Sequence, residues 1–94
     1  MWEPDQLRAI VERGRRASSL MADASFLWIV DDQTNHHLSA LVAARPGPAS
    51  ADAVAYHHNQ MHAITDLVGT LKGYAEAGEA AQRAIEAPNE DNDV

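Results

Sequence analysis

The sequence contains no cysteine, a single phenylalanine and no apolar run long enough to cross a membrane. Without cysteine, disulfides and thiolate metal sites are excluded. Aromatic residues make up 5% of the 94 positions, so the core must come from Ala, Leu, Ile, Val and Met. The longest apolar run, residues 26–30, is far shorter than the roughly 18 residues that a membrane span needs. We therefore expect no membrane insertion.

Basic residues are scarce, with 7 Lys and Arg against 14 Asp and Glu, which gives a net charge of −7. Four of the basic residues lie near the start of the chain, at Arg8, Arg13, Arg15 and Arg16. We interpret this cluster as a solvated helix face and expect no nucleic-acid binding, because phosphate contacts need a wide positive surface. The first residues carry acid where a secretory signal carries Lys or Arg. We expect a protein that is cytoplasmic as synthesised, with any secretion by a Sec-independent route.

Apolar and small residues recur at alternating three- and four-residue spacing over most of the second half of the chain. This period places them on one stripe of a long α-helix, with Ser50 as its N-cap and its end at Glu86. The stripe consists of Val54, His57, Met61, Ile64, Val68, Leu71, Ala75, Gly78 and Ile85. Met61, Ile64, Val68 and Leu71 are the residues that we expect to meet a partner.

The first half of the chain has a helical period over residues 5–45. Gly14 weakens this arm and the polar segment 31–35 weakens its middle, where Thr34 is a candidate cap for a new helix. The arm is therefore either one bent helix or two shorter helices with a break near residues 31–35. The prolines in segment 45–48 end the arm.

Two arms of similar length predict an all-α antiparallel helical hairpin, in which positions that sum to about 95, such as Leu38 and His57, lie opposite each other. Because a hairpin leaves one side of its core exposed, we expect two of them to form a four-helix bundle. Residues 1–87 would form a single helical domain, and residues 88–94 an acidic disordered tail.

His36 and His37 precede the expected turn by about as many residues as His57 and His58 follow it, and His62 lies one helical turn further along. His58 and His62 have the i, i+4 spacing that lets two imidazoles reach one metal, and His37 or His36 is a candidate third ligand across the turn. The simpler interpretation is that His57 packs in the core while His36, His58 and His62 are solvated. A third interpretation is a pH-sensitive joint, because imidazoles gain charge near pH ~6.5.

Motifs of known chemistry are missing from the sequence. It has no glycine-rich phosphate loop and no Ser–His–Asp arrangement, and no opposed carboxylate pair has a reason for a raised pKa. We expect that the protein is not an enzyme and has no cofactor.

The segment from Tyr74 to Ile85 contains a tyrosine, an acid at Glu79 and many alanines. In this the chain resembles the small helical-hairpin substrates of bacterial type VII (ESX) secretion, whose second helix ends in a Tyr-x-x-x-Asp/Glu signal. Here Glu79 is one position late, after Gly78, and the turn has Pro46-Gly47-Pro48 where that family has Trp-x-Gly. The resemblance implies export as a folded dimer, with Tyr74 and Glu79 recognised by a secretion ATPase.

These observations favour a non-enzymatic protein that acts through helix packing with itself or a related helical hairpin. A type VII secretion substrate is the most specific form of this hypothesis. A small acidic intracellular regulator, such as an antitoxin or a phage-encoded inhibitor that binds a basic protein surface, is the first alternative. A helical bundle that binds metal through histidines is the second.

Overall fold

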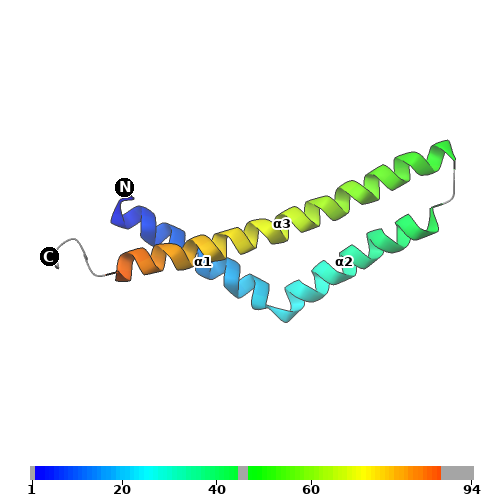
Figure 1. Cartoon of the computed structure of the whole chain (residues 1–94). Helices are drawn as coiled ribbons and strands as arrows, with labels where there is room; N and C mark the ends of the chain where they lie inside the picture. Colours follow the sequence, from blue (N-terminus) through cyan, green and yellow to red (C-terminus); the bar gives the residue numbers. More distant parts are fainter. Residues whose placement is uncertain (1, 45–46, 88–94) are drawn as a thin grey trace. The chain divides into compact units, whose positions relative to one another are not determined.

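The computed structural model of this chain describes residues 2–44 and 47–87, with residues 48–50 described in their backbone only. Three α-helices make up nearly all of this part: α1 (Pro4–Ala22), α2 (Ala24–Ala43) and α3 (Pro48–Glu86) (Figure 1). No strand occurs within these described ranges. The all-α class predicted from the sequence is confirmed.

The chain divides into two compact units, each built from parts of two helices. In the described ranges, unit 1 comprises residues 2–20 and 70–87, and unit 2 comprises residues 21–69. Unit 1 therefore contains most of α1 and the C-terminal part of α3, whereas unit 2 contains α2 and the N-terminal part of α3. The single domain over residues 1–87, the hairpin and the four-helix bundle stay predictions, and the expected tail at 88–94 lies outside the described residues.

The first arm is broken at Asp23, so the break predicted near residues 31–35 was wrong. Asp23 has an extended backbone and its carboxylate accepts a hydrogen bond of 2.9 Å from the N–H of Phe26. This is the N-cap geometry that satisfies a free donor in the first turn of a helix. Residues 31–35 lie inside α2, and the Thr34 hydroxyl donates to the carbonyl of Val30 instead of capping a new helix.

α3 begins at Pro48, two residues before the predicted cap at Ser50. Proline suits the first helical position, because it has no N–H to leave unpaired and its φ is already helical. Gly47 precedes it with a φ of +151°, a conformation that glycine adopts readily, and its carbonyl accepts from the N–H of Ala51. The helix ends at Glu86, as the sequence predicts.

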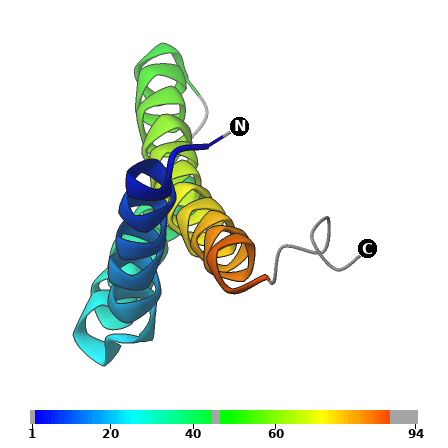
Figure 2. The ribbon, with the colours of Figure 1, turned by 90° about the vertical axis from the view of Figure 1, so that its left-hand side faces the viewer.

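α1 crosses the C-terminal part of α3 at two glycines (Figures 1 and 2). A Cβ atom built on Gly14 would lie 2.7 Å from the Cα of Gly78 and 2.6 Å from the carbonyl oxygen of Tyr74. Such distances leave no room for a side chain, so the two backbones touch directly. Ala17 of α1 and Leu71 and Ala81 of α3 are the buried apolar residues of unit 1. Its core is therefore small and depends on close approach of the two helices.

Unit 2 has no buried apolar residue among those that the structure describes. Of the side chains described in this unit, that of His37 alone is buried, with 6% of its surface exposed. Large apolar side chains are exposed on both of its helices: Leu27, Trp28, Ile29, Leu38, Val42, Val54, Tyr56 and Leu67. Phe26, Val30, Leu41, Met61, Ile64 and Val68 are half-buried. Of the stripe predicted on α3, Leu71 and Gly78 are buried, whereas Val54 and Ile85 at its ends are exposed.

The glycine crossing predicts opposite effects for two Gly→Ala substitutions on α3. Gly78→Ala places a Cβ 2.9 Å from the Cα of Gly14, so the helices must move apart, at a cost of about 1–3 kcal/mol in the free energy of unfolding. Gly73→Ala meets no atom within 4 Å and improves helix propensity, so it should add up to about 1 kcal/mol. Urea unfolding followed by circular dichroism measures both. Equal effects of the two variants would contradict the crossing.

Candidate functional site

In unit 2, α2 and α3 meet at a contact between two imidazoles. Nδ1 of His37 on α2 lies 2.8 Å from Nδ1 of His57 on α3. His36 and Tyr56 lie beside the pair, with ring centroids 5.1 Å and 6.2 Å from that of His37. The hairpin rule assigns Leu38 to His57, whereas the structure places His37 there. The side chain that faces α3 is thus that of His37, one residue before Leu38.

The distance between these nitrogens limits how many protons the contact can hold. At 2.8 Å, one Nδ1 must donate its hydrogen and the other must accept it. If both imidazoles are fully protonated, both Nδ1 atoms carry a hydrogen, so the contact has no acceptor and two positive charges meet. Burial lowers the pKa of His37, and the nearby imidazoles of His57 and His36 lower it further. The folded state therefore favours a neutral His37.

The metal ligands suggested by the sequence do not come together as a set. His58 and His62 lie against each other on α3, with ring centroids 4.6 Å apart, and both are exposed. His37 contacts His57 instead. In residues 2–44 and 47–87, no group of three His, Cys, Asp or Glu side chains is arranged to hold a metal ion. His37 was not predicted to be buried, although its spacing from Val30 and Leu41 places all three on one stripe of α2.

A second candidate site is a groove of about 490 Å³ within unit 1. Its apolar part is formed by Ala17, Leu20, Leu71 and the ring of Tyr74. The Arg13 guanidinium carbon lies 4.1 Å from the centroid of the Tyr74 ring, a cation–π geometry that fixes both side chains. We call this site the Arg13–Tyr74 groove.

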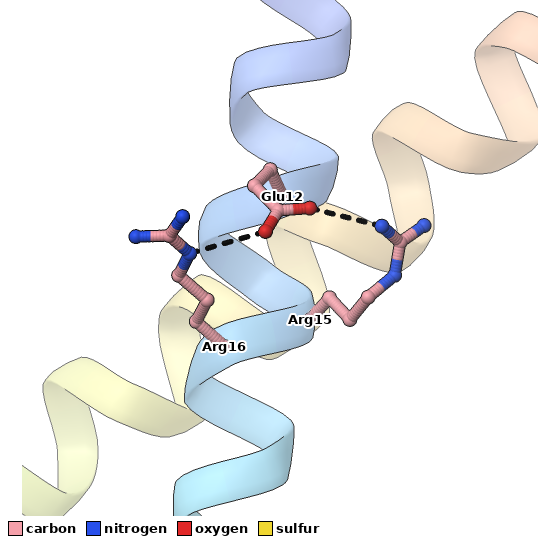
Figure 3. Close-up of polar contacts among 3 residues, drawn as sticks. All are labelled: Glu12, Arg15 and Arg16. Atoms are coloured by element: carbon pink, nitrogen blue, oxygen red, sulfur yellow. Dashed lines mark hydrogen bonds and ion pairs between the residues drawn. The ribbon is translucent and has the colours of Figure 1, made fainter.

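The rim of the Arg13–Tyr74 groove carries more positive than negative charge. Glu12 is shared by two arginines, with one carboxylate oxygen 2.9 Å from Arg15 and the other 3.1 Å from Arg16 (Figure 3). Arg13 has no carboxylate partner in the described part of the chain. Of the three arginines near Glu12, Arg13 is therefore the one that Glu12 does not pair with. The basic cluster seen in the sequence contributes directly to the edge of a groove.

The residues proposed for partner binding or a secretion signal differ in exposure. Tyr74 is half-buried in the groove and Glu79 is exposed. Gly78, the position where a Tyr-x-x-x-Asp/Glu signal has its acid, is buried against Gly14. Met61, Ile64 and Val68 are half-buried in unit 2, and Leu71 is buried in unit 1.

Comparison with known proteins gives no relative from which a function can be transferred. The chain matches no protein-family model, no curated protein and no solved structure. No helix in the described ranges has the length and hydrophobicity to cross a membrane.

The histidine contact predicts that the free energy of unfolding falls as the solution is acidified. Because the pKa of His37 is lower in the folded than in the unfolded state, the unfolded chain binds more protons on acidification. The stabilising contribution of neutral His37 should be complete above pH ~6.5, the unfolded-state pKa, and should be lost as the pH falls through the folded-state pKa. Urea unfolding between about pH 8 and pH 5 measures the slope.

Two substitutions isolate the contribution of His37 to this slope. His37→Gln keeps a hydrogen-bonding group but does not titrate, so its slope should be shallower than that of the wild type. His62→Gln removes an exposed histidine from the same unit and should retain the wild-type slope. If His37→Gln keeps the full slope, the pH dependence has another origin.

Proposed function

We propose that this chain is a non-enzymatic protein that works through helix packing, with partner helices covering the exposed apolar side chains of unit 2. The observation that carries the proposal is the lack of any buried apolar residue in the described part of unit 2. Helices gain most of their stability from burying an apolar face, and short isolated helices are marginal in water. Unit 2 presents such side chains and leaves them uncovered.

A four-helix bundle is the simplest arrangement in which these side chains become buried. Val42 and Trp28 have 80% and 67% of their surface exposed, so most of each side chain is available for burial by a partner. Half-buried Met61, Ile64 and Val68 lie along α3 in the same unit, where a second pair of helices would complete their burial. The hairpin and its pairing with a second hairpin are the finer form of this proposal.

Export by a type VII system is the most specific form of the function. Its support is the helical architecture together with Tyr74, which lies in a groove beside an arginine, and Glu79, which is exposed. With Gly78 required at the helix crossing, a signal in this chain would use Glu79 as its acid.

The acidic surface of unit 2 favours a basic partner. Asp23, Asp31, Asp32, Asp52 and Asp66 are all exposed. Opposite charge on a partner would speed association and select among competing surfaces. A regulator that covers a basic protein surface would use the same side chains, so this alternative differs from the first proposal in the partner and not in the site.

Helix packing with a partner predicts that α2 is protected from hydrogen exchange only when the chain is associated. Sedimentation at several protein concentrations identifies the associated and monomeric ranges, and exchange is then measured in each. A tenfold rise in concentration should stabilise an associating chain by about 1.4 kcal/mol at most per added partner. A monomer with slowly exchanging α2 amides would contradict the proposal.

The secretion hypothesis predicts that Tyr74→Ala lowers export from a host that carries a type VII system. Glu76→Ala, which removes an exposed side chain two residues away on the same helix, should leave export unchanged. Both variants are compared with the wild type for cellular level and helix content, so that loss of folding is detected. Wild-type export of a folded Tyr74→Ala variant would exclude Tyr74 as a signal.

A further inference from the structure

Trp28 is the most exposed aromatic side chain that the structure describes, with 67% of its surface accessible. Asp31 and Asp32 follow it by three and four residues on α2 and are also exposed. Residues at these spacings are neighbours on one helix face. α2 thus presents a large apolar side chain with two carboxylates one turn away.

The Arg13–Tyr74 groove has the complementary arrangement. Its apolar part, formed by Leu20, Leu71 and the Tyr74 ring, lies next to the guanidinium groups of Arg13 and Arg16. Its volume of about 490 Å³ falls in the range of about 300–1,000 Å³ that is typical of ligand pockets. Tryptophan and arginine are the residues most often found to dominate binding energy at protein interfaces.

The geometry points to binding of the α2 face of a second copy of this chain in the Arg13–Tyr74 groove, with Trp28 on the apolar part and Asp31 or Asp32 at Arg13 or Arg16. This inference rests on the proposed function and identifies the partner. Both surfaces are present on every copy, so no other protein is needed.

Charge favours this contact in spite of the overall charge of −7. Glu12, the acid of the groove, is already paired with Arg15 and Arg16 (Figure 3). Arg13 has no carboxylate partner in the described ranges, and an arriving aspartate supplies one. Two copies that met through their acidic α2 faces would instead bring like charges together.

The contact joins two different surfaces, so each copy gives one face and receives another. Contacts of this kind close into rings or continue as open chains, whereas a self-complementary contact stops at a dimer. This difference gives the inference a test that depends on mixing two variants, each of which lacks one surface.

The test uses Trp28→Ala, which removes the inserted side chain, and Arg16→Glu, which reverses a charge at the groove. Each variant alone should associate about thirtyfold more weakly than the wild type, the loss expected for a dominant interface residue. An equimolar mixture should form dimers, because the Arg16→Glu copy still carries Trp28 and the Trp28→Ala copy still has an intact groove. Sedimentation velocity measures the species.

A Trp2→Phe background leaves Trp28 as the only tryptophan, so its fluorescence reports insertion in the groove. Emission should shift to shorter wavelength in the mixture but not in Arg16→Glu alone. Arg8→Glu is the matched control, because Arg8 lies on the same helix but does not line the groove. It should associate as the wild type does. Circular dichroism of each variant confirms that it is folded.

The outcomes separate this inference from the proposed function. If Trp28→Ala and Arg16→Glu both associate like the wild type, or if both are weak and mixing restores nothing, the inference is wrong although helix packing with a partner stands. A wild-type chain that remains a monomer with a protected α2 contradicts both. Restoration by mixing, together with the fluorescence shift, supports the head-to-tail contact.

Discussion

The backbone contact between Gly14 and Gly78 is the constraint on which the rest of unit 1 depends. With no Cβ on either residue, α1 and α3 approach until only small side chains fit beside the crossing, as Ala17 and Ala81 do. The same approach brings Arg13 over the ring of Tyr74 and forms the groove next to it. The packing of the two glycines therefore determines the position of the Arg13–Tyr74 groove.

Unit 2 differs from unit 1, because its buried side chain is polar and its described apolar side chains are at most half-buried. Leu27, Trp28 and Val42 remain exposed to solvent, whereas His37 is buried. A hydrogen bond between imidazoles contributes modestly to stability and depends on pH, so it cannot replace apolar burial. The incomplete core of unit 2 is the physical basis for the proposed role in helix packing.

The sequence predicts the helical class and the end of α3, but not the contacts between helices. Periodicity and proline identify the helical class and the end of α3 at Glu86. The break at Asp23 was missed because a polar run at 31–35 is a more obvious interruption than one capping aspartate. From the sequence, Gly14 is expected only to weaken its helix. Its packing role depends on Gly78, which is 64 positions away in the chain, so local sequence does not reveal it. The only sequence signal for the burial of His37 is its helical spacing from the apolar residues Val30 and Leu41.

The glycine pair also restricts how this chain can change over evolutionary time. A first substitution at either position introduces a Cβ that the other backbone excludes, so replacing both residues requires passing through a strained intermediate. Divergent descendants of the same fold should therefore keep small residues at both sites while their surfaces change freely. A glycine in the first helix matched to one near the end of the third would then be a signature for recognising distant members when overall similarity has faded.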